Sequence, residues 1–251
     1  MSAADLPGQV HVSADADATA LAAGEWLSNR GADAVATKGE FHVALAGGST
    51  PARLYALLGA PPIRDEVEWE RWWLWFGDER AVPPADEASN SGLVERTLLR
   101  ALAPDQPAAT FRMEAERPDI AGAAAAYSRL LDSHLMIGPG GAPRLDVVLL
   151  GLGENGHTAS LFPGDPSLDV TDRWAVHSRA DYAPFDRITL TYPALNAASR
   201  VAFLVTGAAK AQAFAGVLAG TAPAARVRPA DGELHWFLDQ AAAESVPDPS
   251  V

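Results

Sequence analysis

The sequence predicts an α/β fold with a mainly parallel sheet flanked by helices. Short apolar runs alternate with stretches of helical periodicity, a pattern typical of parallel strands joined by crossover helices. Several apolar runs end in turns rich in glycine or charge, and ligands of open parallel sheets bind beyond the carboxyl ends of the strands. Strands are predicted at residues 9–12, 41–46, 72–76, 145–150, 187–191, 201–206 and 233–237.

Helices are predicted between the strands. Apolar residues at helical spacing indicate a helix over about residues 17–30. Thr50 is expected to cap a helix that has Pro51 at its first position. Further helices are expected over residues 90–102 and from about residue 210 to residue 218, surface loops at residues 61–65, 104–110 and 138–143, and a frayed tail at residues 244–251.

The composition is that of a water-soluble globular protein. The chain has 251 residues, of which 48% are hydrophobic and 20% charged, and it contains no fixed repeat and no convincing linker. We therefore expect residues 1–251 to form a single domain. No stretch reaches the roughly 18 uninterrupted apolar residues of a membrane span, and residues 1–12 lack the features of a secretory signal. A cytoplasmic protein without a membrane partner is predicted.

Charge and cysteine content exclude several classes of function. A formal net charge of −13 argues against a nucleic-acid partner, since clustered lysine and arginine bind phosphate backbones. Without cysteine, the chain forms no disulfide, no thiolate nucleophile and no cysteine metal site. The histidines and acids show no metal-ligand spacing, and no Gly-x-Ser-x-Gly elbow is present. Neither a metal nor an acyl-serine mechanism is predicted.

The first glycine turn, at residues 47–51, has the form of a phosphate cradle. Gly47 and Gly48 let the backbone approach an anion, Ser49 supplies a hydroxyl, and the start of the next helix offers free N–H groups. A tight strand-to-helix turn without a ligand explains the same residues equally well. Other anion-binding groups nearby would favour the cradle.

Two acids and an arginine follow the predicted strand at residues 72–76. Arg80 is predicted to hold a phosphate or carboxylate, and Asp78 to orient it or to bind sugar hydroxyls. Glu79 is expected to be a solvated turn residue in a local ion pair. The tryptophans of the strand are expected to pack in the sheet, because no basic stripe accompanies them.

A third turn contains Gly151, Gly153 and Gly156 directly after a predicted strand, with the Gly-x-Gly-x-x-Gly spacing of dinucleotide sites. The Phe-Pro-Gly at residues 162–164 leaves too little room for the long helix of such a site, so no NAD and no other cofactor is predicted. His157 lies at the rim of this turn, where an imidazole can take a proton from water. A purely structural histidine is the alternative.

Lys210 is one of only two lysines in the chain, and it follows the apolar run at residues 201–206. This position brings an ammonium group to the same strand-end edge as the other candidates, and a compact point charge suits a phosphate. A solvated lysine on a helix surface is the alternative.

These motifs resemble the 6-phosphogluconolactonases, in order and over nearly the whole chain. The resemblance implies a Rossmann-like fold shared with glucosamine-6-phosphate deaminase. It also implies metal-free hydrolysis of 6-phospho-D-glucono-1,5-lactone to 6-phospho-D-gluconate in the oxidative pentose phosphate pathway. The matching segments are residues 47–50, 77–80, 151–163, 187–191 and 236–239.

The same resemblance implies roles for individual residues. His157 matches the family's proposed general base, and Arg80 and Lys210 match positions that hold the substrate phosphate. Many relatives have aspartate where this chain has Asn155, whose amide can orient a neighbour but cannot ionise. The expected catalytic residues are His157, Asn155 and Asp78, and the expected substrate-binding residues are Gly47, Gly48, Ser49, Arg80, Arg187 and Lys210.

The oxyanion formed during hydrolysis is expected to be stabilised by backbone N–H groups of the glycine turns, helped by Arg80 or Arg187. Two alternative functions remain open. A glucosamine-6-phosphate deaminase would use the same cradle, but its Gly-His segment continues with an acid that residues 158–162 lack. A non-catalytic sensor would bind a sugar phosphate without turnover. The chain is expected to be a monomer or a small homo-oligomer.

Overall fold

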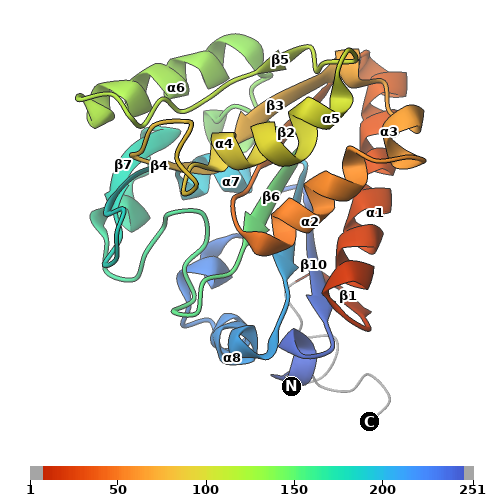
Figure 1. The fold of residues 1–251 in the computed structure, drawn as a ribbon. Helices are drawn as coiled ribbons and strands as arrows, with labels where there is room; N and C mark the ends of the chain where they lie inside the picture. Colours follow the sequence, from red (N-terminus) through yellow and green to blue (C-terminus); the bar gives the residue numbers. More distant parts are fainter. Residues whose placement is uncertain (1–7, 246–251) are drawn as a thin grey trace.

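Two β-sheets organise residues 8–245, the part of the chain that the computed structural model describes (Figure 1). The smaller sheet is antiparallel, with the order β4 (Asp78–Arg80), β8 (Asp186–Leu190) and β7 (Ala175–Arg179). The larger sheet is parallel throughout, and its strand order is β1 (Gln9–Ser13), β10 (Glu233–Asp239), β9 (Arg200–Val205), β6 (Val147–Gly151), β2 (Phe41–Leu45), β3 (Trp72–Phe76) and β5 (Ala109–Thr110).

Helices flank the sheets and connect their strands (Figure 1). The long helix α1 (Ala16–Lys38) contacts β1, β2, β9 and β10 and packs on α2 (Ser49–Leu58), while α6 (Ile120–His134) packs on β7 and β8. Of the helices between residues 8 and 245, none combines the length and apolarity that crossing a membrane requires. The other helices are α3 (Ile63–Glu66), α4 (Asn90–Val94), the π-helical η3 (Glu95–Leu99), α5 (Arg100–Leu102), α7 (Tyr192–Asn196) and α8 (Ala211–Leu218), and the 3₁₀ turns are η2 (Trp69–Arg71), η4 (Pro139–Gly141), η5 (Pro166–Asp169), η6 (Ala208–Lys210), η7 (Pro223–Arg226) and η8 (Ala242–Ser245).

The strand order of the large sheet reverses between β2 and β6. From β2 the chain proceeds to β3 and β5 on one side, and from β6 it proceeds to β9 and β10 on the other. Because these strands run in one direction, their carboxyl ends lie along a common edge. Connections diverge at such a reversal and leave a crevice in which ligands bind. The fold therefore directs attention to the ends of β2 and β6.

The predicted α/β architecture is confirmed, with one strand in a different sheet. Six of the seven predicted strands lie in the parallel sheet, and β3 has the predicted bounds. The strand predicted at residues 187–191 is β8, and its expected place in the parallel sheet is wrong. Only residues 180–185 separate it from β7, which suffices for a hairpin, whereas a parallel crossover needs about a dozen residues or more.

Several helix boundaries also differ from the prediction. Helix α1 starts after the capping side chain of Asp15 and extends past the predicted end at residue 30. Helix α2 begins at Ser49, and the Thr50 hydroxyl lies 2.7 Å from that of Thr206 instead of capping the helix. The predicted helix over residues 90–102 is formed by α4, η3 and α5 in succession.

Some segments were predicted differently or not at all. Most of α3 and all of β5 lie within the predicted loops at residues 61–65 and 104–110, and β4 lies in a predicted turn. No helix was predicted at α6 and no strand at β7. Residues 246–251 of the predicted tail lie outside the described residues. That residues 1–251 form a single domain stays a prediction.

Aromatic side chains fill the core on both sides of the parallel sheet. Trp72 and Trp75 are buried, as expected for sheet packing, and the Trp75 ring stacks on Phe111 at a centroid distance of 4.0 Å. The residues of β2 are all buried, which is typical of a central parallel strand.

Two buried tyrosines fasten the carboxyl ends of β2 and β3. The Tyr55 hydroxyl accepts a hydrogen bond from the N–H of Ala46 at 2.9 Å and donates one to the Ala46 carbonyl at 2.7 Å. The Tyr127 hydroxyl makes the same pair of bonds with Phe76, at 2.8 and 3.1 Å. These hydroxyls supply partners to backbone groups at the point where both strands leave the sheet for the loops beyond it.

Replacing Tyr55 or Tyr127 by phenylalanine is expected to lower the free energy of unfolding by about 1–3 kcal/mol, because buried backbone groups lose their partner. Equilibrium urea unfolding measures this change. Tyr182→Phe is the matched control, since no residue between 8 and 245 hydrogen-bonds to the Tyr182 hydroxyl. The control is expected to unfold at the wild-type midpoint, and wild-type stability of both other variants would contradict the role assigned to their hydroxyls.

Candidate functional site

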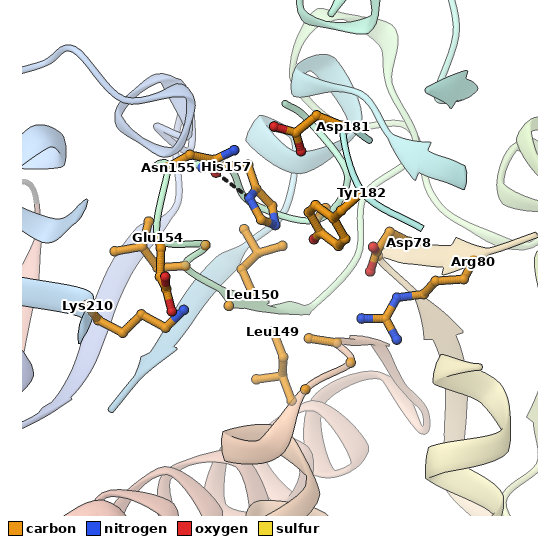
Figure 2. A pocket seen from close by; sticks show the side chains of 18 residues that line it. Asp78, Arg80, Leu149, Leu150, Glu154, Asn155, His157, Asp181, Tyr182 and Lys210 are labelled. Carbon is orange, nitrogen blue, oxygen red and sulfur yellow. Dashed lines mark hydrogen bonds between the residues drawn. The ribbon is translucent and has the colours of Figure 1, made fainter. Parts of the chain in front are cut away.

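A pocket of about 500 Å³ lies at the carboxyl edge of the parallel sheet, where the strand order reverses (Figure 2). Its walls come from the segments that follow β2, β3, β6 and β9 and from the connection between β7 and β8. Most of the predicted site residues therefore meet in one cavity. Those that line it are Gly47, Gly48, Asp78, Arg80, Asn155, His157 and Lys210.

Two predicted site residues lie outside the lining. Ser49 is exposed at the first position of α2. Arg187 is 2% exposed and occupies the position in β8 that pairs with Arg80 of β4. Its guanidinium lies 5.3 Å from the centre of the Tyr182 ring, and that ring belongs to the pocket wall. Arg187 thus influences the pocket through its charge and through Tyr182.

A glycine turn after β6 holds His157. The N–H of Gly153 donates to the His157 carbonyl at 2.8 Å and closes the turn. A Cβ atom on Gly153 would lie 2.0 Å from the imidazole ring, so only glycine fits. Gly156 has a φ of +79°, and a Cβ there would lie 2.6 Å from Ala222. The two glycines therefore bring the imidazole close to the backbone and fix where it can lie.

The side-chain amide of Asn155 selects the tautomer of His157 (Figure 2). Its Oδ1 accepts a hydrogen bond from the backbone N–H of His157 at 3.2 Å, which fixes the amide with its oxygen toward the histidine. The same oxygen lies 2.5 Å from Nδ1 of the ring. Because this oxygen can only accept, Nδ1 carries the proton and Nε2 keeps its lone pair. The imidazole is thereby oriented as a base.

The surroundings of His157 keep its imidazole neutral. Burial lowers the pKa of His157 to about 4, and the charges of Lys210 and Arg187 act in the same direction. The charges of Asp78 and Asp181 oppose this shift, because a carboxylate stabilises the imidazolium form. At neutral pH the ring is therefore unprotonated at Nε2 and able to accept a proton.

Two neutral donors hold Asp78 in the pocket wall. Nδ2 of Asn90 donates to one carboxylate oxygen at 2.9 Å, and the Ser160 hydroxyl donates to the other at 2.6 Å. Asn90 in turn packs against Gly47, where a Cβ would lie 1.8 Å from the amide oxygen. Asp78 is 7% exposed, and each of its carboxylate oxygens accepts a hydrogen bond from one of these neutral side chains. Through Asn90, which bonds to Asp78 and packs on Gly47, the segment after β3 contacts the turn after β2.

Glu79 is buried, contrary to the prediction that it is a solvated turn residue. It is 3% exposed, and its carboxylate accepts hydrogen bonds from the backbone N–H groups of Arg80, Asn90 and Ser91 and from the Ser89 hydroxyl. Two of these N–H groups belong to the first turn of α4, where a negative charge is favourable. Glu79 fixes the start of this helix and hence the side chain of Asn90.

Arg80 and Arg187 are two neighbouring arginines, of which Arg80 lines the pocket and Arg187 is buried outside the lining. They are cross-strand neighbours in the small sheet, and Nη1 of Arg80 donates to the Ala88 carbonyl at 2.5 Å. The Nε atoms of both are buried, and no residue between 8 and 245 accepts a hydrogen bond from them. Burial and then the charge of Arg80 lower the pKa of Arg187, while the charge of Asp78 opposes this shift. Unpaired donors on adjacent cations favour an anionic ligand.

Three further polar side chains line the pocket that the sequence analysis did not propose as site residues, namely Glu154, Asp181 and Tyr182. Glu154 belongs to the same turn as Asn155. Asp181 and Tyr182 lie in residues 180–185, which carry no recognisable motif. Recognising β7 as a hairpin partner of β8 would have indicated that this connection reaches the site.

Within residues 8–245, no group of three or more histidine, aspartate and glutamate side chains is arranged to hold a metal ion. The segment after Gly156 forms turns where a dinucleotide site would have a long helix. The polar side chains that line the described pocket are an imidazole, three carboxylates, an amide, a tyrosine hydroxyl and two cations.

Comparison with known proteins gives concordant results. Residues 14–236 match the family model described as glucosamine-6-phosphate isomerases/6-phosphogluconolactonase. A 6-phosphogluconolactonase of Nostoc sp. is 40% identical over 83% of this chain and 86% of its own. One of Streptomyces coelicolor is 37% identical over 97% of this chain and 96% of its own.

Solved structures show the same relationship. The 6-phosphogluconolactonase of Trypanosoma brucei aligns with a TM-score of 0.85 at 29% identity, over 96% of this chain and 99% of that one. A monomeric glucosamine-6-phosphate deaminase aligns with a TM-score of 0.77 at 20% identity, over 94% of this chain and 99% of that one, and shares the fold.

The imidazole of His157 is expected to titrate with a pKa of about 4 in the free protein and to carry its neutral-state proton on Nδ1. NMR correlation of the ring nitrogens and carbon-bound protons measures both properties, with His157→Gln identifying the resonances. Asn155→Asp is expected to raise this pKa, because the added carboxylate stabilises the imidazolium. An Nε2-protonated ring in the wild type would contradict the orientation assigned to the Asn155 amide.

Proposed function

The chain belongs to the family of glucosamine-6-phosphate isomerases and 6-phosphogluconolactonases, and from this premise we propose that it hydrolyses 6-phospho-D-glucono-1,5-lactone to 6-phospho-D-gluconate in the oxidative pentose phosphate pathway. The observation that carries the proposal is the neutral imidazole of His157, whose free Nε2 belongs to a pocket that also contains Arg80 and Lys210. A positioned base beside cationic side chains suits hydrolysis of an ester that bears a phosphate.

In the proposed reaction, His157 acts first as a base and then as an acid. Nε2 takes a proton from water while the water oxygen bonds to C1 of the lactone, and the carbonyl oxygen becomes an oxyanion. When the oxyanion collapses, the bond between C1 and the ring oxygen breaks. The imidazolium returns its proton to that oxygen, which becomes the free hydroxyl of the product. The new carboxylic acid ionises in water.

Three residues support this base without touching the substrate carbon. Asn155 holds the tautomer, so that Nε2 is the free nitrogen. Asp78 and Asp181 stabilise the imidazolium by charge, as their effect on the pKa of His157 indicates. We propose that Asp78 contributes in this way, as a fixed negative charge held by Asn90 and Ser160.

We assign the substrate phosphate to the side of the pocket where Lys210 lies. The start of helix α2 is joined to the segment that carries Lys210, because the hydroxyls of Thr50 and Thr206 lie 2.7 Å apart. Gly48 precedes this helix, so free N–H groups and a lysine are available to one phosphate. Figure 2 shows Arg80 on the opposite side of His157. The sequence alone predicted that both Arg80 and Lys210 bind the phosphate. We propose instead that Lys210 binds the phosphate and that Arg80 lies beside the lactone ring.

The two alternative functions have less support. The deaminase match is at 20% identity and indicates the fold alone. Residues 158–162 contain no acid, and the Ser160 hydroxyl among them is bound to Asp78. A sensor would keep the pocket and show no turnover. A cytoplasmic location, the absence of a nucleic-acid partner and a monomer or small homo-oligomer stay predictions.

The wild-type protein is expected to accelerate the disappearance of 6-phosphogluconolactone, and His157→Ala is expected to lower kcat by about 100-fold or more. Removing the base explains this loss, and corrected spontaneous hydrolysis provides the baseline. The kcat/KM of the wild type is expected to fall only as pH drops through about 4, because His157 is protonated below its pKa. Binding of 6-phosphogluconate by wild type without any turnover would refute the hydrolase and favour the sensor.

Lys210→Met is expected to reduce kcat/KM for the phosphorylated lactone by about 10- to 100-fold, since one charge-assisted interaction with phosphate is lost. The rate with the dephosphorylated lactone, measured in parallel, is expected to stay unchanged. Arg80→Met serves as the comparison and is expected to lower the rates with both lactones to a similar degree. If Arg80→Met alone removed the preference for phosphate, the assignment of the two ends of the pocket would be reversed.

A further inference from the structure

Tyr182 occupies an unassigned position in the pocket wall. It lies in the connection between β7 and β8, at residues 180–185, and lines the pocket although 46% of its surface is exposed. Of the described residues that line the pocket, Tyr182 alone carries a hydroxyl group. The wall therefore contains one O–H donor, beside glycines, aliphatic side chains, charged groups, the Asn155 amide and the His157 imidazole.

The Tyr182 ring is placed by contacts on several sides. The guanidinium of Arg187 lies 5.3 Å from its centre, in a cation–π contact. The Phe162 ring meets it edge-on at 6.0 Å, and the His157 ring lies 6.5 Å away. A buried cation, an aromatic edge and the imidazole thus define where this partly exposed ring lies.

The hydroxyl of Tyr182 is available to a ligand. No residue between 8 and 245 forms a hydrogen bond with it. In Figure 2 the Tyr182 side chain lies between His157 on one side and Asp78 and Arg80 on the other. Its hydroxyl is directed into the pocket. The buried hydroxyls of Tyr55 and Tyr127 are bound to the backbone, whereas the hydroxyl of the partly exposed Tyr182 is open to water or to a ligand.

We infer that the Tyr182 hydroxyl donates a hydrogen bond to the carbonyl oxygen of the lactone and stabilises the oxyanion that forms when water adds to C1. This inference rests on the proposed hydrolysis and adds a residue that the sequence did not suggest. Water activated by His157 reaches C1, so the oxygen bonded to C1 lies near the imidazole, within the region that Tyr182 borders. The positive charge of Arg187 beneath the ring favours negative charge on that side of the pocket.

The alternative for this hydroxyl is a bond to one of the sugar hydroxyl groups. Such a bond would be equally strong before and during the reaction and would change KM alone. A bond to the carbonyl oxygen strengthens as negative charge develops there, so its loss lowers kcat. The two roles therefore differ in a measurable parameter.

The test is the hydrolysis of 6-phosphogluconolactone by wild type, Tyr182→Phe and Phe185→Leu. Tyr182→Phe keeps the ring and is expected to lower kcat by about 100-fold, with little change in KM. Its affinity for 6-phosphogluconate, measured by calorimetry, is expected to match the wild type. Phe185 is in the same connection but outside the pocket lining, so Phe185→Leu is expected to retain the wild-type kcat.

Each other outcome overturns the inference in a distinguishable way. A wild-type kcat in Tyr182→Phe would remove the hydroxyl from the reaction, and a change in KM alone would move it to a sugar hydroxyl. An equal loss in Phe185→Leu would attribute the effect to disturbance of the connection. A wild type that binds 6-phosphogluconate but does not hydrolyse the lactone would overturn the proposed function, and the role of Tyr182 with it.

Discussion

The reversal of strand order between β2 and β6 is the constraint from which the site follows. Because the chain leaves β2 toward β3 and leaves β6 toward β9, the loops beyond these two strands diverge. The crevice between these loops can hold a ligand only if the loops pack closely against their neighbours and leave the space open. Gly47 and Gly153 meet this requirement, since a Cβ on either would collide with Asn90 or His157. These two glycines are therefore needed for close packing of the loops, and this packing leaves space for a ligand.

The acids and the arginines of the site are kept apart by neutral donors. Glu79 is satisfied by backbone N–H groups and a serine, and Asp78 by an amide and a hydroxyl. If these carboxylates instead paired with Arg80 and Arg187, the cations would be neutralised before a substrate arrived. The observed arrangement leaves both Nε atoms without a partner among the described residues. Buried polar groups that satisfy one another thus preserve positive charge for an anionic ligand.

Local patterns in the sequence predicted most of the fold. They did not predict contacts between segments that are distant in the sequence. Strand β3 was recognisable because five consecutive large apolar residues leave no other reading, and His157 because its turn is dense in glycine. The burial of Glu79 was missed because its partners begin a helix about ten residues later. Tyr182 was missed because its nearness to His157 depends on the pairing of β7 with β8, and β7 is only five residues long with two apolar residues.

The neutral amide of Asn155 explains how a base with a low pKa fits this site. A carboxylate at that position would raise the pKa of His157 and make it a stronger base, but would place a second negative charge in the turn that already carries Glu154. The amide provides the same orientation without charge, and burial keeps the ring deprotonated at neutral pH. In the proposed reaction, the charge that stabilises the imidazolium then comes from Asp78 and Asp181, on segments after β3 and β7. Orientation and charge stabilisation, which one aspartate would combine, are in this chain divided between separate loops.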